Sequence, residues 1–177
     1  FKIAQAMVAL QEGVITEETR IRCDRSIIDC HGPHSNEDLR GAITHSCNPY
    51  FWGVLRRMIN QGVSDNPYDD TRIGLQEWSR HIGSFGFGKR LGIDLPNEKG
   101  GLVPDPAYYD RAYGGRPWKF SNIYSIAIGE GENMVVPLQM SNFAATIANK
   151  GYYITPHLVK SIGTTGEPLP QYREKHI

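Results

Sequence analysis

Residues 36–62 read NEDLRGAITHSCNPYFWGVLRRMINQG and decide the fold, because two helix-like segments meet there at Ser46-Cys47-Asn48. The acid-rich start at 36–38 predicts a helix over 36–45. The second segment takes Asn48 as its N-cap and has Pro49 in its first turn, before Gly62 ends it. Its apolar residues recur at helical spacing: Phe51, Val54, Leu55, Met58 and Ile59. The tripeptide is therefore expected at a helix-to-helix junction, with side chains that can point into a cleft.

Periodicity and turn residues outline the rest of the chain. Helices are predicted over 1–12, 70–82 and 137–150, and a strand over 152–162. Residues 123–128 are predicted to form a short buried strand or a turn. The stretches 14–35 and 83–122 are rich in glycine, proline and other turn formers, so both are expected to be irregular loops.

Composition sets limits on function. The chain has 177 residues, of which 40% are hydrophobic, and its 19 basic and 19 acidic residues balance. This describes a globular unit without the basic surface that nucleic acid needs, so we expect no nucleic-acid partner. No stretch approaches the roughly 20 apolar residues that span a bilayer. Any export signal or membrane anchor is therefore expected upstream of Phe1.

Six short motifs in a fixed order give the chain a resemblance to class B penicillin-binding proteins of the elongation type. They are Phe1-Lys2, Ser46-Cys47-Asn48, Phe85-Gly86-Phe87-Gly88, Gly92-Ile93-Asp94-Leu95-Pro96, Ile128-Gly129-Glu130-Gly131 and Pro137-Leu138-Gln139-Met140. Trp118, before the Gly-x-Gly turn, fits the same pattern. Each motif alone is weak, but together they cover nearly the whole chain.

The resemblance implies a serine D,D-transpeptidase that cross-links D-alanyl-D-alanine stem peptides through an acyl-enzyme and binds β-lactams. In the family's Ser-x-x-Lys motif, Lys2 would be the general base, and the serine would fall two positions before Phe1. Ser46 would relay a proton to the leaving amine. Asn48 would donate its amide to a substrate carbonyl and help to hold the lysine. We therefore expect residues 1–177 alone to be inactive.

Without the other motifs, plainer interpretations of the same residues are available. Lys2 could be an ordinary solvated lysine, Ser46 a helix-terminal serine and Asn48 a simple helix cap.

The fold that the resemblance implies is an α/β transpeptidase domain of the β-lactamase and penicillin-binding-protein type, in which a helical subdomain packs on an antiparallel sheet. This chain would be part of that domain. Residues 1–150 would supply the helical subdomain, and 151–177 the start of the return to the sheet. The chain should thus be mostly helix and irregular loop with little strand. The family's Lys-Ser/Thr-Gly strand is expected beyond Ile177.

The three cysteines form a second constellation, because all of them fall within 25 residues together with three histidines. Three thiols and one imidazole complete a tetrahedral zinc shell. We predict a structural Zn²⁺ bound by Cys23, Cys30, His34 and Cys47. His34 is preferred over His31 because it directly precedes the cap of the 36–45 helix, which leads back to Cys47. His45 is preferred less because its neighbour Cys47 should face the same cluster from a different turn.

Two alternatives to zinc stay open. Enzymes of this class act outside the cytoplasmic membrane, where an oxidising environment favours a Cys23–Cys30 disulfide with Cys47 as a buried thiol. The third state is three free thiols.

Three functional classes follow: the cell-wall transpeptidase, a β-lactam sensor that uses the same acylation, and a zinc-stapled interaction module without catalysis. For the first, the resemblance implies stem peptides and β-lactams as ligands and a polymerising glycosyltransferase as partner. It also implies a periplasmic location at the inner membrane. Catalysis itself would need no cofactor.

Overall fold

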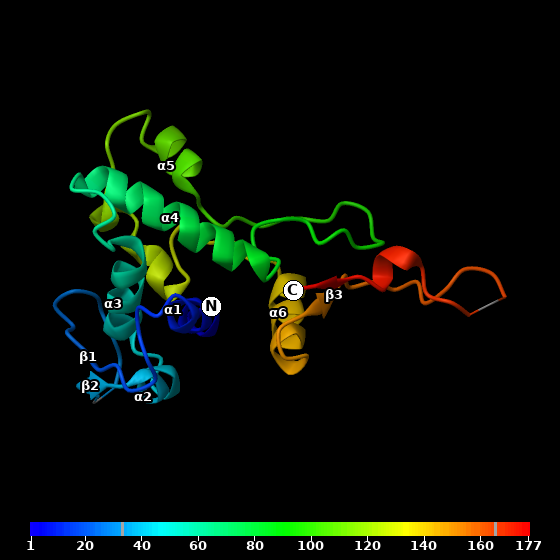
Figure 1. Cartoon of the computed structure of the whole chain (residues 1–177), viewed down its shortest axis with the longest axis horizontal. Helices are drawn as coiled ribbons and strands as arrows, with labels where there is room; N and C mark the ends of the chain where they lie inside the picture. Colours follow the sequence, from blue (N-terminus) through cyan, green and yellow to red (C-terminus); the bar gives the residue numbers. More distant parts are fainter. Residues whose placement is uncertain (33, 165) are drawn as a thin grey trace. The chain divides into compact units, whose positions relative to one another are not determined.

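The structure is a computed structural model that describes residues 1–32, 34–164 and 166–177. Helices predominate in this part of the chain, which confirms the expected mainly helical content (Figure 1). The α-helices are α1 (Lys2–Gln11), α2 (Leu39–Thr44), α3 (Asn48–Ile59), α4 (Pro67–Ser84), α5 (Pro106–Ala112) and α6 (Pro137–Ala148). The 3-10 helices are η1 (Phe120–Asn122), η2 (Tyr124–Ile128) and η3 (Pro170–Tyr172).

The strands are short and form two antiparallel pairs. They are β1 (Ile21–Arg22) with β2 (Asn36–Glu37), and β3 (Tyr153–Ile154) with β4 (Lys175–His176). No helix among the described residues combines the length and the apolar character that crossing a membrane requires.

Contacts divide the chain into two compact units. The first comprises 1–82 and 104–133, and the second comprises 83–103 and 134–177. In the second unit, Phe143 of α6 packs edge-on against Phe85. Gln139 of α6 donates to the carbonyls of Lys89 and Gly100, both at 2.8 Å. These contacts fix the glycine-rich 85–88 segment and the following loop onto α6.

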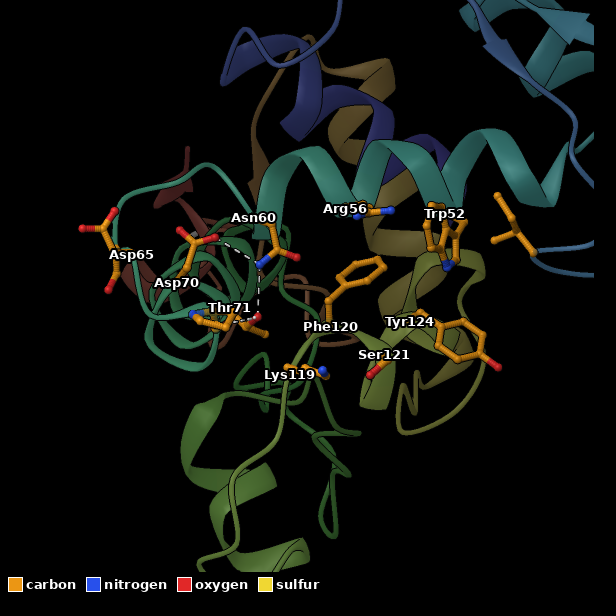
Figure 2. Close-up of a pocket in the computed structure, with 13 residues that line it drawn as sticks. Trp52, Arg56, Asn60, Asp65, Asp70, Thr71, Lys119, Phe120, Ser121 and Tyr124 are labelled. Atoms are coloured by element: carbon orange, nitrogen blue, oxygen red, sulfur yellow. Dashed lines mark hydrogen bonds between the residues drawn. The ribbon is translucent and has the colours of Figure 1, made fainter.

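Helix α3 is the centre of the first unit and contacts α1, η2 and β1. Its apolar stripe is buried, as expected: Phe51, Val54, Leu55 and Ile59 have no exposed surface, and Met58 is 3% exposed. A Cβ on Gly74 of α4 would lie 2.0 Å from the Ile59 carbonyl oxygen, so the close approach of α4 to the end of α3 needs glycine. The side chain of Asn60, directly after α3, also holds the two helices together by donating to Asp70 and Thr71 of α4, both at 3.1 Å (Figure 2).

Gln5 is a fully buried polar side chain that ties three elements together. Its amide nitrogen donates to the carbonyls of Phe51 at 3.0 Å and Ala127 at 3.1 Å. Its amide oxygen accepts from the indole nitrogen of Trp78 at 3.3 Å. The helix that carries Lys2 is thus held to α3, η2 and α4 by one residue.

Replacing Gln5 with methionine should destabilise the chain by about 3 kcal/mol, because two carbonyls and one indole N–H lose their partner without access to water. In a chain of this size the Tm should fall by about 6 to 12 °C. The matched control is Gln11→Met at the exposed end of the same helix, whose Tm should stay within about 2 °C of the unsubstituted chain. Equal Tm values for the two variants would contradict this role of Gln5.

The junction around residue 46 differs from the sequence prediction in two details. Residues 36–37 form strand β2 rather than a helix start, and α2 begins at Leu39, because Asp38 is the N-cap and accepts from the Gly41 amide at 2.8 Å. Asn48 is the first residue of α3 and not its cap, a position that Cys47 takes. The Asn48 side chain is therefore free to make other contacts.

Three other predictions also need correction. The expected loop 83–122 contains α5, which starts after Asp105, whose carboxylate accepts from the Tyr108 amide at 2.7 Å. Residues 124–128 form the 3-10 helix η2 and not a strand. The strand expected over 152–162 is limited to Tyr153–Ile154, and its partner Lys175–His176 lies in a polar segment without a clear pattern.

Candidate active site

The structure brings Lys2, Ser46 and Asn48 together although 44 residues separate the first two in sequence. The Lys2 ammonium donates to the Ser46 carbonyl oxygen at 2.7 Å, to Ser46 Oγ at 2.8 Å and to Asn48 Oδ1 at 2.5 Å. It also lies 5.8 Å from the centroid of the Phe51 ring. All three donors of the ammonium are used, so its position is fixed.

Ser46 occupies a strained backbone position at the end of α2. Its φ of 53° is in the left-handed region, where non-glycine residues are uncommon. The Ser46 amide donates to Ile43 O and the Cys47 amide to Ala42 O, as in a helix C-terminal motif that usually ends in glycine. A serine here is destabilising by about 1 kcal/mol, and it places both of its oxygens toward Lys2.

The turn 129–131 lies against the start of α1. Gly129 has a φ of 81°, and a Cβ there would lie 2.7 Å from the Phe1 Cβ. Only glycine therefore lets this turn approach the residue that precedes Lys2. Close packing against Phe1 thus explains why the first residue of the Gly-x-Gly motif is glycine. The motif lies next to Lys2 and is part of the candidate active site.

Lys2 is half-buried, and this burial lowers the pKa of its amine below the ordinary value of 10.5. The negative charge of Glu130 and of any thiolate at Cys30 or Cys47 acts in the opposite direction. A lysine with a lowered pKa has a larger neutral fraction at a given pH, and the neutral amine is the form that can accept a proton.

A cavity of about 430 Å³ lies beside Asn48, between residues 28–31 and the segment from Tyr124 to Glu130. Asn48 Nδ2 donates to the Asp29 carbonyl at 2.8 Å, so both ends of its amide are bound. Asp29 and Tyr124 were not expected from the sequence, because neither a loop nor a short 3-10 helix has a periodicity that would place them. The second amide hydrogen of Asn48 still has no protein acceptor among the described residues.

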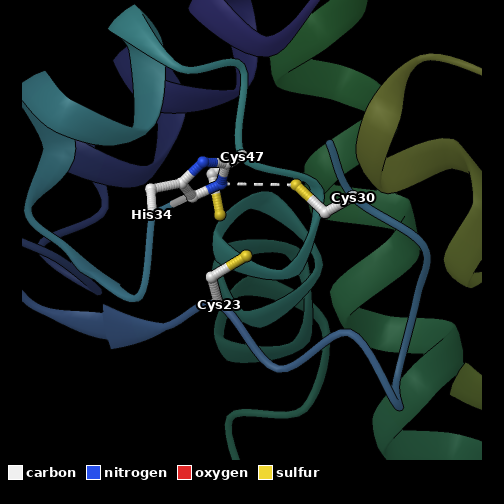
Figure 3. A group of neighbouring side chains, drawn as sticks. All are labelled: Cys23, Cys30, His34 and Cys47. Atoms are coloured by element: carbon white, nitrogen blue, oxygen red, sulfur yellow. Dashed lines mark hydrogen bonds between the residues drawn. The ribbon is translucent and has the colours of Figure 1, made fainter. Parts of the chain in front are cut away.

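Cys23, Cys30, His34 and Cys47 form one group (Figure 3), and Cys30 also lines this cavity. Their sulfur and ring-nitrogen atoms all lie within 4.8 Å of one another, and Cys30 Sγ is 3.4 Å from His34 Nε2. All three thiols are free. The four residues of the sequence prediction are therefore one group, which is near enough to hold a metal ion.

The geometry and the chemistry of this group fit zinc. With Zn–S bonds of about 2.3 Å, a tetrahedral shell has ligand atoms about 3.8 Å apart, so the group needs to contract by at most about 1 Å. Burial raises the pKa of Cys47 to about 12, so without a cation this thiol stays neutral. A bound divalent ion would supply the charge that thiolates at this buried place require.

The cysteine–histidine group touches the candidate active site directly. The backbone amide of Asn48 donates to Cys30 Sγ at 3.3 Å, and the neighbouring Asp29 carbonyl accepts from the Asn48 side chain. Cys47 lies between Ser46 and Asn48 in sequence. Anything that moves residues 29–30 or Cys47 therefore moves Asn48 as well.

Comparison with known proteins gives the same family throughout. Residues 1–176 match the penicillin binding protein transpeptidase domain. The chain is 29% identical over 128 residues to the peptidoglycan D,D-transpeptidase MrdA of Acinetobacter baumannii, and 32% identical over 136 residues to that of Haemophilus influenzae. These matches cover 72% and 76% of the chain, which spans only 17% and 18% of the relatives' own length.

Solved structures are similar as well. PBP2 of Pseudomonas aeruginosa in complex with WCK 5153 superposes with a TM-score of 0.76 at 25% identity, over 99% of this chain and 36% of that one. The complex of PBP2 with MreC from Helicobacter pylori gives 0.67 at 25% identity, over 97% of this chain and 31% of the other.

Proposed function

Because the chain belongs to the transpeptidase-domain family of the penicillin-binding proteins and is of the PBP2 type, we propose that it carries part of the active site of a peptidoglycan D,D-transpeptidase. The observation that supports this most is the contact of Lys2 with both Ser46 and Asn48. A lysine, a serine and an asparagine on three different helix ends are in direct contact, and the asparagine lines the cavity.

In this proposal Lys2 is the general base. The nucleophilic serine of the family motif falls outside residues 1–177, one helical turn before Lys2. The neutral Lys2 amine takes the proton of that serine as it attacks the D-alanyl-D-alanine bond. Ser46 Oγ, which can donate as well as accept, passes a proton to the leaving amine. The free amide hydrogen of Asn48 binds a substrate carbonyl, while Oδ1 keeps Lys2 in place.

The test needs a version of the protein that extends before Phe1. It should be acylated by labelled penicillin, and it should then transfer a stem-peptide acyl group to the amine of a second peptide. Acylation without transfer would favour the β-lactam sensor. A folded protein that shows neither reaction would contradict the proposal and leave the non-catalytic interaction module.

Asn48→Asp should shift the pH dependence of penicillin acylation to higher pH. A carboxylate 2.5 Å from the Lys2 amine favours the ammonium form and raises the pKa of Lys2. At a fixed pH below this pKa, the rate should fall about tenfold for each unit by which the pKa rises. The matched control is Asn149→Asp at the exposed end of α6, which should leave rate and profile unchanged. A lower rate with an unshifted profile would contradict the contact with Lys2.

We further propose that Cys23, Cys30, His34 and Cys47 bind a structural Zn²⁺. The group has no position left open for substrate, so the ion would stabilise the segment after strand β1 that carries Cys23 and Cys30 and would not take part in the reaction. The gathering of all four ligands favours zinc over a Cys23–Cys30 disulfide, which would leave Cys47 and His34 without a role. Free thiols are the other alternative.

Location and partners follow from the same proposal. A protein that cross-links stem peptides acts on the periplasmic side of the inner membrane, where β-lactams also reach it. A complex of PBP2 with MreC has been solved for Helicobacter pylori, and we propose a partner of the MreC kind here. The polymerising glycosyltransferase is a prediction from family resemblance alone.

A further inference from the structure

The first unit contains a second cavity, of about 600 Å³, that the proposed reaction does not use (Figure 2). It lies between the C-terminal half of α3, the start of α4 and the η1 segment. Its volume is within the range of about 300 to 1,000 Å³ that is usual for ligand pockets.

Two polar residues that line this cavity, Asp70 and Thr71, already have hydrogen-bond partners in the protein. The buried Asp70 carboxylate accepts from the Asn60 side chain at 3.1 Å and from the Val63 amide at 2.8 Å. The Thr71 hydroxyl donates to the Pro67 carbonyl at 2.8 Å. The polar groups of Asp70 and Thr71 are therefore occupied by protein partners, and the Asp70 carboxylate keeps its negative charge.

The walls carry two cations without a counter-ion. The Arg56 guanidinium lies 5.4 Å from the centroid of the Trp52 ring, and Lys119 is on the other side of Phe120 (Figure 2). Neither makes an ion pair with a carboxylate among the described residues. The other carboxylate that lines the cavity, Asp65, is exposed and lies away from both cations in Figure 2.

An arginine stacked on an indole is pre-oriented, and its N–H edge is available for a carboxylate. Trp52 and Phe120 meet edge to face at 5.3 Å and form an apolar surface beside it. A cavity of this size that is lined by an arginine, a lysine and an aromatic surface suits a peptide that carries a free carboxylate.

The cavity is next to the candidate active site. Tyr124 lines both this cavity and the one beside Asn48, and the consecutive residues Ile27 and Ile28 line one each. A peptide bound beside Asn48 can therefore continue past Tyr124 toward Arg56. We propose that Arg56 and Lys119 bind an internal carboxylate of the stem peptide whose D-alanyl end lies beside Asn48, an inference that rests on the proposed function.

Two matched probes test this. One is N-acetyl-γ-D-glutamyl-L-lysyl-D-alanyl-D-alanine, which has a free internal carboxylate, and the other is the same peptide with that carboxylate as an amide. Binding to the chain is followed by NMR of the Trp52 indole and Tyr124 ring signals. The peptide with the free internal carboxylate should bind about tenfold more tightly than the amide peptide, as expected for one charge-assisted contact. It should also shift the NMR signal of the Trp52 indole.

Arg56→Gln and Lys119→Gln should each weaken the carboxylate peptide about tenfold and leave the amide peptide unchanged. Arg57→Gln is the matched control, because Arg57 is the next residue of α3, is exposed and does not line the cavity. The affinity of Arg57→Gln for the carboxylate peptide should stay within about twofold of that of the unsubstituted chain. Melting curves show that each variant is folded.

Equal affinity for the two peptides, unchanged affinity in both variants, or no shift of the Trp52 signal would each overturn the inference. The proposed function fails by a different result, which is the absence of penicillin acylation in the unsubstituted longer protein. If acylation occurs and the internal carboxylate makes no difference, only this further inference is wrong.

Discussion

Lys2→Met should lower the rate of acylation by labelled penicillin by about 10³-fold in a version of the protein that extends before Phe1. Methionine keeps the apolar part of the side chain and removes the amine that contacts Ser46 and Asn48. In the unsubstituted protein the rate should rise with pH as Lys2 becomes neutral. Because burial lowers the pKa of Lys2, this rise should occur below pH 10.5. It should be absent in the variant.

The control is Lys99→Met, at an exposed position in the second unit, which should change neither the rate nor its pH dependence. Circular dichroism and the Tm check that Lys2→Met is folded. A folded variant with an acylation rate within tenfold of the unsubstituted protein would contradict the role of Lys2 as the base. Lys2 would then be a residue that only holds the Ser46 turn in place.

The sequence was sufficient for those elements whose signals are local and regular. Helices α1, α3 and α6 have apolar stripes at helical spacing, and the structure buries the stripe of α3. Helix α5 was missed because its seven residues lie among prolines and glycines, although Asp105-Pro106 is a regular helix start. Strands β2 and β4 are two residues long, and pairing with a distant segment, not local propensity, makes them extended.

The contacts of the candidate site also fall into those that the sequence predicted and those that it did not. Lys2, Ser46 and Asn48 could be placed together because family order links motifs that 44 residues separate. The contact of Asn48 with Asp29, and the cavity that Tyr124 shares with Arg56, depend on loop conformation and on packing between helices. No pattern of spacing encodes these contacts. Only the three-dimensional structure shows the contact of Asn48 with Asp29 and the cavity that Tyr124 and Arg56 line.

Purified protein that is kept reduced should contain about one zinc ion per chain, and removal of the ion should cause a large loss of stability. A ligand present at a thousand times its Kd stabilises the folded state by about 4 kcal/mol. For a chain of this size, that corresponds to a fall in Tm of about 8 to 16 °C after chelation. Metal analysis and melting curves, with and without chelator, measure both effects. The affinity should fall at low pH, because the ligands must lose their protons.

His34→Asn and His31→Asn form a matched pair, because both histidines are in the same loop but only His34 is in the cluster. His34→Asn should lose most of the zinc, whereas His31→Asn should keep it. In the longer protein His34→Asn should also be acylated more slowly, since the loop of Cys30 contacts Asn48 through two hydrogen bonds. A zinc content near zero in reduced protein supplied with the ion would contradict the metal site, and alkylation of the three cysteines without prior reduction would then separate free thiols from a Cys23–Cys30 disulfide.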